Sequence, residues 1–134
     1  MIRFVYLTAL LLPAGTFAGT VIYTDSAHPV IPGSSAEAQV VYLDAPDKIQ
    51  ADLFTGLSAD PRQAEARARA VLTSPEFRQR QADLSSAFAG VIKAWQLQLQ
   101  RYPAVVFDDN YVVYGTTDVD LASAHLSNWQ EARR

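Results

Sequence analysis

Short apolar runs, separated by polar and turn-forming residues, predict the strands of this chain. Residues 20–24 and 40–43 are rich in Val, Ile, Tyr and Thr, which favour a pleated, half-buried surface, and they predict the first two strands. Two similar runs at 104–107 and 111–114 are separated by Asp-Asp-Asn. Because Asx residues favour tight turns, this short spacer predicts a β-hairpin near the C-terminal end.

Helix start signals follow the second strand. Asp44 predicts the beginning of a short helix that ends near Gly56. Asp60-Pro61 predicts the start of an alanine-rich helix, since Ala is the best helix former. Ser74-Pro75 repeats the signal, which predicts either a new helix or a kink.

The helix expected from about residue 75 to residue 98 has the clearest periodicity in the chain. Its apolar positions recur at helical spacing and are expected in the core: Phe77, Leu84, Phe88, Val91 and Trp95. After Gly115, Thr117 or Asp118 is expected to cap a last helix. The apolar face of that helix is formed by Val119, Ala122, Leu126 and Trp129. The element order is therefore β, β, α, α, α, hairpin, α in one mixed α/β domain.

The first residues are organised like a secretory signal. Arg3 precedes an apolar run over residues 4–12, and small residues follow up to Ala18, where cleavage is expected. The run is shorter than the ~20 residues that a permanent membrane span requires. A buried N-terminal strand or a short anchor is the alternative. We expect a signal peptide at 1–18, a single domain at 19–134 and a periplasmic location.

Composition excludes several classes of function. The chain has 11 basic and 14 acidic residues, and its arginines are scattered along the sequence rather than gathered in a stripe. Direct contact with nucleic acid is therefore not expected. The chain has no cysteine, which excludes a lipoprotein anchor, a disulfide framework and a thiol active site.

The polar residues give little indication of catalysis, so we predict a protein that is not an enzyme and holds no cofactor. Three carboxylates have the hard oxygen ligands that metals such as Ca²⁺ take, but turn and cap positions account for them without a metal: Asp108, Asp109 and Asp118. Neither His28 nor His125 belongs to a pair with metal-ligand spacing. A small hydrolase that uses His28 with Asp25 is the alternative.

The order of elements resembles the plan of a thioredoxin-like domain, with a mixed central sheet, a C-terminal β-hairpin and flanking helices. In that fold a proline before the hairpin faces the loop after the first strand, and Tyr102-Pro103 stands at the matching place. Tyrosine before proline raises the cis fraction of the peptide bond. Active members carry Cys-x-x-Cys in the loop, whereas this chain has Asp25-Ser26-Ala27-His28 there. Disulfide exchange needs a thiolate and is therefore impossible.

Residues 102–108 and 111–119 also resemble the C-terminal signature of a small exported family. That family is encoded in integrative and conjugative elements, within the type IV secretion gene cluster, and is similar to the TrbC-like conjugation proteins. The resemblance covers most of the mature chain, including residues 21–25 and Asp60-Pro61. It implies a periplasmic accessory role in conjugative DNA transfer, with other exported proteins of the apparatus as partners. A periplasmic chaperone or holdase for pilus subunits is the alternative.

The candidate binding residues come from this plan and from the contact chemistry of tyrosine. The loop at 25–28 and Tyr102-Pro103 are expected to lie together. Tyrosine is enriched at protein interfaces, and the pleat places Tyr111 and Tyr114 on opposite faces, so one of them is expected to be partly exposed. The alternative is that both lie at the edge of the core. The candidates for partner binding are Asp25, Ser26, His28, Tyr102, Pro103, Tyr111 and Tyr114.

Overall fold

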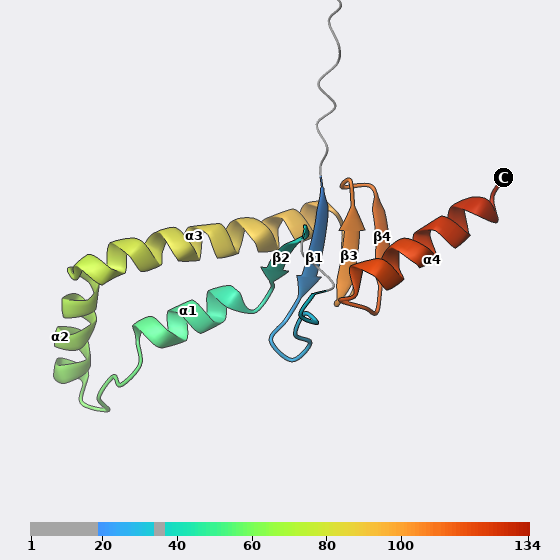
Figure 1. The fold of residues 1–134 in the computed structure, drawn as a ribbon. Coiled ribbons are helices and arrows are strands. Elements are labelled where there is room, and N and C mark those ends of the chain that lie inside the picture. The colour runs from blue at the N-terminus through green and yellow to red at the C-terminus, as the bar shows by residue number, and fades with distance from the viewer. Residues whose placement is uncertain (1–18, 34–36) are drawn as a thin grey trace, which may run out of the picture.

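The computed structural model describes residues 19–33 and 37–134 and shows a mixed α/β fold (Figure 1). The expected signal peptide and its cleavage site after Ala18 lie outside the described residues. The elements follow the predicted order. The strands are β1 (Thr20–Thr24), β2 (Gln39–Tyr42), β3 (Ala104–Phe107) and β4 (Tyr111–Tyr114), and the helices are α1 (Ala45–Leu53), α2 (Pro61–Leu72), α3 (Pro75–Gln96) and α4 (Val119–Glu131).

The four strands form one mixed sheet in the order β2-β1-β3-β4. β1 is parallel to β2 and antiparallel to β3, with Ile22 opposite Val105. β3 and β4 form the predicted hairpin, which is confirmed. Asp108 and Asp109 in its turn both have φ of 52°, a left-handed conformation that Asp tolerates better than most residues.

One helix packs against each face of the sheet. Ile22 and Val105 are fully buried on the face against which the start of α4 packs, together with Ala122. The next residues along the two strands, Tyr23 and Val106, point to the other face, where α3 contributes the buried Ala94. The period of two along the strands thus divides the core into two layers.

The predicted core face of α3 is wrong at two of its aromatic residues. Trp95 is 81% exposed and Phe88 is 42% exposed, whereas the neighbouring Ala94 is buried. The reason is a close approach between helix and sheet. A Cβ on Gly90 would lie only 2.6 Å from Cγ1 of Val41 in β2, so small residues occupy this side and the large ring is directed elsewhere.

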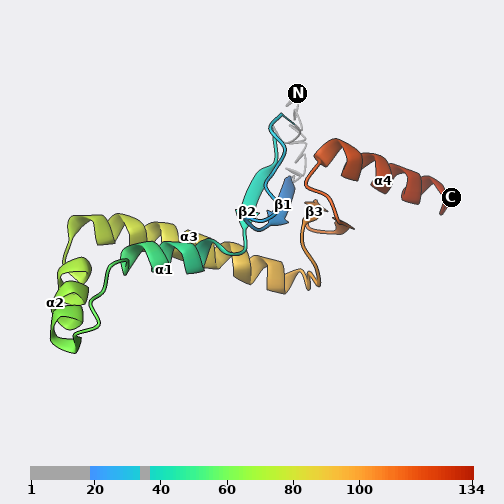
Figure 2. The same ribbon diagram turned by 90° about the horizontal axis from the view of Figure 1, so that it is seen from below.

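Helices α1, α2 and α3 form an arm that extends beyond the sheet (Figure 2). α1 runs beside α3, and α2 lies across their far ends. α3 is a new helix rather than a kinked continuation of α2, because the Ser74 side chain accepts a hydrogen bond from the Phe77 N–H at its start. At 1.5 Å per residue, its 22 residues span about 33 Å.

Candidate functional site at the end of the sheet

The antiparallel pairing of β1 and β3 brings two of the predicted candidate segments together. Tyr23 lies opposite Ala104, so the loop that leaves β1 at Asp25 meets the residues that enter β3. The peptide bond between Tyr102 and Pro103 is cis. The Pro103 carbonyl accepts a hydrogen bond of 2.8 Å from the Gly115 N–H, which ties this entry to the end of β4.

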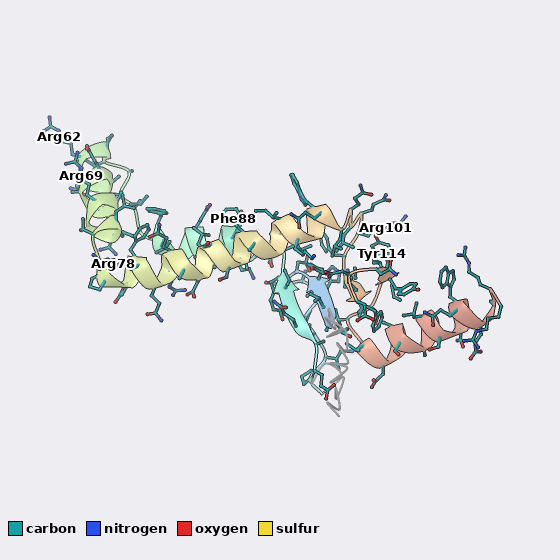
Figure 3. The ribbon with its side chains drawn as sticks, turned by 90° about the horizontal axis from the view of Figure 1, so that it is seen from above. Arg62, Arg69, Arg78, Phe88, Arg101 and Tyr114 are labelled. Carbon is teal, nitrogen blue, oxygen red and sulfur yellow. The ribbon has the colours of Figure 1, made fainter. Side chains whose placement is uncertain are left out.

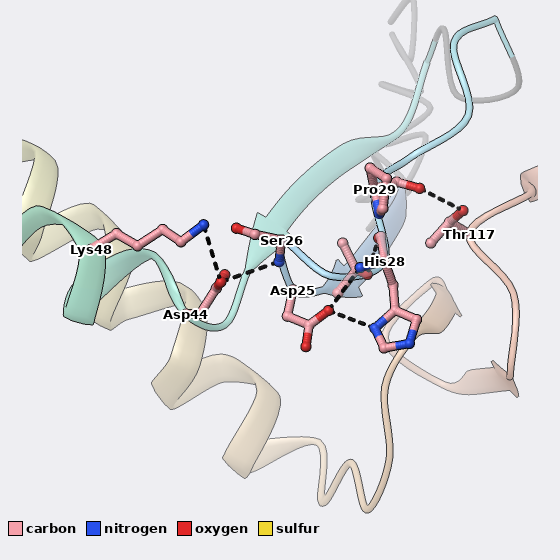
Figure 4. A network of polar contacts seen from close by, with 8 residues as sticks. Asp25, Ser26, His28, Pro29, Asp44, Lys48 and Thr117 are labelled. Carbon is pink, nitrogen blue, oxygen red and sulfur yellow. Dashed lines mark hydrogen bonds and ion pairs between the residues drawn. The ribbon is translucent and has the colours of Figure 1, made fainter.

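The loop after β1 is closed on itself by Asp25 (Figure 4). One carboxylate oxygen, Oδ1, accepts the backbone N–H of His28 at 3.0 Å and lies 2.6 Å from Nδ1 of the same residue. The Thr24 hydroxyl donates to the His28 carbonyl at 2.6 Å. The imidazole is half-exposed and meets the ring of Tyr102 edge to face, with centroids 6.5 Å apart. The loop therefore presents an oriented histidine beside an exposed tyrosine.

Asp44 connects this loop to α1. It occupies the N-cap position, so the predicted start of the helix is confirmed, but its side chain makes no cap hydrogen bond. Its Oδ2 atom instead accepts the Ser26 N–H at 3.2 Å and lies 3.5 Å from Nζ of Lys48. Burial alone would raise the pKa of the Asp44 carboxyl, but the hydrogen bonds from Ser26 and the charge of Lys48 together hold that pKa below its usual value.

A hollow of about 400 Å³ opens between this loop, the start of α1 and the end of α3. Its wall combines carboxylates with large aromatic rings. Two of its residues, Trp95 and Tyr102, are 81% and 52% exposed. The lining consists of Asp25, Leu43, Asp44, Asp47, Val91, Ala94, Trp95, Leu99, Gln100, Arg101 and Tyr102. We call this site the acidic hollow.

The two hairpin tyrosines lie at different ends of the sheet. Tyr114 is opposite Ala104, and its hydroxyl accepts the Gln100 N–H at 3.4 Å, so it borders the end that carries the candidate loop. Tyr111 is at the far end of the same strand, where its ring packs edge to face against Trp129 with centroids 6.2 Å apart. The structure thus groups six of the seven candidates and leaves Tyr111 apart from them.

The Asp25–His28 pair is one element of a hydrolase site. A carboxylate on Nδ1 orients an imidazole as a hydrolase requires, but that reaction also needs a nucleophile or an activated water within reach. Ser26 is engaged with Asp44 instead. Across the described ranges, no three His, Cys, Asp or Glu side chains are grouped as a metal site would need. Within the same ranges, no helix has the length and apolarity to cross a membrane.

Sequence reasoning missed Asp44, Asp47 and Trp95 as lining residues of the hollow. Asp44 was assigned to a cap, and Trp95 was assigned to the core. A signal for the correct orientation of α3 was present, because the small residues Gly90 and Ala94 mark the side that approaches the sheet.

The chain was compared with the curated proteins, with the solved structures and with models of protein families. Neither the curated proteins nor the solved structures contain a match. Residues 17–132 match a family model described as "Protein of unknown function (DUF1525)", and because the match spans most of the chain, the protein belongs to the DUF1525 family.

Proposed function

We propose that the protein is an exported, non-catalytic interaction module of a conjugative DNA-transfer apparatus of the type IV secretion kind. It docks other exported components through the end of the sheet that carries Asp25, His28 and Tyr102. One observation carries the proposal. The loop after β1 meets the cis Tyr102-Pro103 segment and presents an exposed aromatic ring and an oriented histidine, where thioredoxin-like enzymes place their thiols.

Strand order and segment placement support a thioredoxin-like plan. The hairpin joins β1 in the antiparallel sense, and the proline segment lies beside the loop that follows β1. The absence of cysteine removes disulfide exchange from this scaffold. Exposed tyrosines remain, and a ring that is half in contact and half in water is typical of protein interfaces.

Two features of the sequence support the proposed cellular setting. The apolar start with its small-residue end supports export to the periplasm. The resemblance of residues 102–108 and 111–119 to an exported family of integrative and conjugative elements supports the conjugative role. A flanking set of conjugation genes is the simplest independent support for this setting.

The test is recovery of partners from the envelope of donor cells. Tagged protein should retain secretion-apparatus proteins, and the double change His28→Ala with Tyr102→Ala should release them and lower mating frequency. The matched control is His125→Ala, which removes the other histidine from an exposed position on α4. Recovery of no apparatus protein, together with normal mating after gene deletion, would overturn the proposal.

A hydrolase is the second candidate, because Asp25 Oδ1 lies 2.6 Å from His28 Nδ1. Asp25→Asn separates the two functions. An enzyme whose histidine is oriented by this carboxylate should lose activity by a large factor, about 10⁴ in the serine-protease case. If the site is a binding surface, the asparagine keeps the shape of the aspartate side chain. The variant should then retain most of the partner recovery, and cells that carry it should retain most of their mating frequency.

A further inference from the structure

The far end of the arm carries an excess of positive charge, unlike the rest of the chain. Residues 60–80, which form the far end of the arm, hold five of the eleven basic residues and only three of the fourteen acidic ones. The rest of the chain is correspondingly acidic. All five lie within residues 62–80, on α2 and the first turns of α3. Figure 3 labels three of them, Arg62, Arg69 and Arg78. We call this set the arginine tip: Arg62, Arg67, Arg69, Arg78 and Arg80.

The arginine tip is also open to contact. Every residue of α2 is at least partly exposed, and so are Arg78 and Arg80. One pair is formed within the tip, between Arg69 Nη2 and Glu65 Oε1 at 2.6 Å. Apolar side chains accompany the charges, since Leu57 is 43% exposed and Leu72 is 51% exposed.

The acidic hollow is complementary to the arginine tip in charge and in exposed apolar surface. Asp25, Asp44 and Asp47 supply three carboxylates to its lining, against one guanidinium from Arg101. Asp44 also pairs with Lys48 at 3.5 Å, and Asp25 lies 2.6 Å from Nδ1 of His28. Trp95 forms an exposed aromatic wall. On the same helix, Phe88 and Ile92 continue an apolar stripe towards the arm, 42% and 55% exposed.

Within one molecule these two surfaces cannot meet. α1 begins beside the hollow and runs outward along α3, and α2 lies at the far end of the pair (Figures 1 and 2). Along α3, from Arg80 at the edge of the tip to Val91 at the edge of the hollow, the two surfaces are about 16 Å apart at 1.5 Å per residue. Complementary charges that far apart on a rigid helix are screened from each other at physiological salt, where the Debye length is ~8 Å.

We propose that the arginine tip of one copy docks into the acidic hollow of a second copy, so that the chain assembles head to tail. Guanidinium groups of the tip stack on the indole of Trp95 and pair with Asp47 and its neighbours. Arginine over tryptophan is the strongest common cation–π pair, and this chain already makes one within itself, with Arg133 4.3 Å above the ring of Trp129. The exposed leucines of the tip cover the apolar stripe.

The contact is heterologous, because two different surfaces meet. Each added copy leaves one free tip and one free hollow, so the assembly grows into an open filament or closes as a ring. The inference builds on the proposed function in using the same end of the sheet as an interaction surface. A failure of this inference can be distinguished from a failure of the proposed function, since partner recovery from the envelope and self-association of the purified protein are measured separately.

The test is sedimentation velocity on protein purified from cells that produce the full chain. Over a concentration series at low salt, the wild type should form species larger than a dimer, and these should dissociate at high salt. Arg62→Glu with Arg78→Glu should remove them, and so should Asp47→Lys. All three positions are exposed, and unchanged circular dichroism and melting temperature verify the fold. Asp52→Lys makes the same charge change on α1 outside the hollow and should leave association unchanged.

Mixing a tip variant with a hollow variant gives the decisive result. Here the tip variant is Arg62→Ala/Arg78→Ala, because glutamates at these positions would attract the lysine of the Asp47→Lys chain. The Asp47→Lys chain retains an intact tip, and the Arg62→Ala/Arg78→Ala chain retains an intact hollow. A one-to-one mixture should therefore form a dimer and nothing larger. A wild type that stays monomeric at every concentration, or assemblies that survive both variants, would overturn the proposal. So would a tip that binds duplex DNA or anionic vesicles while the protein shows no self-association.

Discussion

Gly90 tests the close approach of α3 to the sheet, which decides where the exposed face of that helix lies. Gly90→Ala places a Cβ 2.6 Å from Val41 Cγ1, well inside the 3.5–4.0 Å at which carbon atoms make favourable contact. Overpacking of this kind costs about 1–3 kcal/mol. Alanine in a helix interior is about 1 kcal/mol more favourable than glycine, which offsets part of this cost. The balance is a net loss of unfolding free energy of up to about 2 kcal/mol.

The same substitution should change sign when Val41 is shortened. In a Val41→Ala background the obstructing methyl groups are absent, so Gly90→Ala should stabilise by about 1 kcal/mol, the helix-propensity gain alone. The double-mutant cycle should therefore report a coupling of about 1–3 kcal/mol between the two positions.

Urea denaturation followed by circular dichroism measures all four proteins of the cycle. Ala82→Gly, at an exposed position of the same helix, measures the difference in helix propensity between alanine and glycine alone. If Gly90→Ala stabilises the protein equally in both backgrounds, α3 does not approach β2 as closely as described, and the account of Trp95 and the hollow fails with it.

Three further changes test individual contacts. Trp95→Ser should alter the unfolding free energy by no more than about 0.5 kcal/mol, because the ring is 81% exposed. A loss of several kcal/mol, measured by urea denaturation, would show that the ring is buried in the core. Asp118→Ala should cost about 1 kcal/mol, because its carboxylate accepts the N–H groups of Asp120 and Leu121 at the start of α4; an unchanged melting temperature would contradict the cap. The pKa of Asp44 is lowered in the folded state, so its ionised form stabilises the protein above the unfolded pKa of about 3.9, and this contribution is lost as pH falls through the lower folded pKa. Asp44→Asn should therefore weaken the acid-side fall of stability in denaturation curves taken from neutral pH down to about 3, and an identical fall in both proteins would refute its role.

Much of the secondary structure was predictable from local chemistry. The hairpin follows from two β-branched runs around an Asp-Asp-Asn turn, and the start of α4 follows from Asp118. These features depend on neighbours within a few residues, so the sequence contains the information needed to predict them. The Asp44 side chain makes no cap hydrogen bond, because its carboxylate accepts a hydrogen bond from a donor that is distant in sequence, the Ser26 N–H.

The amino-acid sequence by itself determined the order of the elements, the absence of thiol chemistry and the meeting of Asp25 with Tyr102 that the thioredoxin-like resemblance implies. Only the tertiary structure decided which side of α3 faces the sheet, because residues 87–95 are apolar apart from Lys93 and allow several orientations. The fit of Gly90 against Val41 selects one of them and leaves Trp95 exposed. The tertiary structure also places the arginines of residues 62–80 at the far end of the arm, away from the sheet, because α1 and α3 extend beyond the sheet (Figure 3).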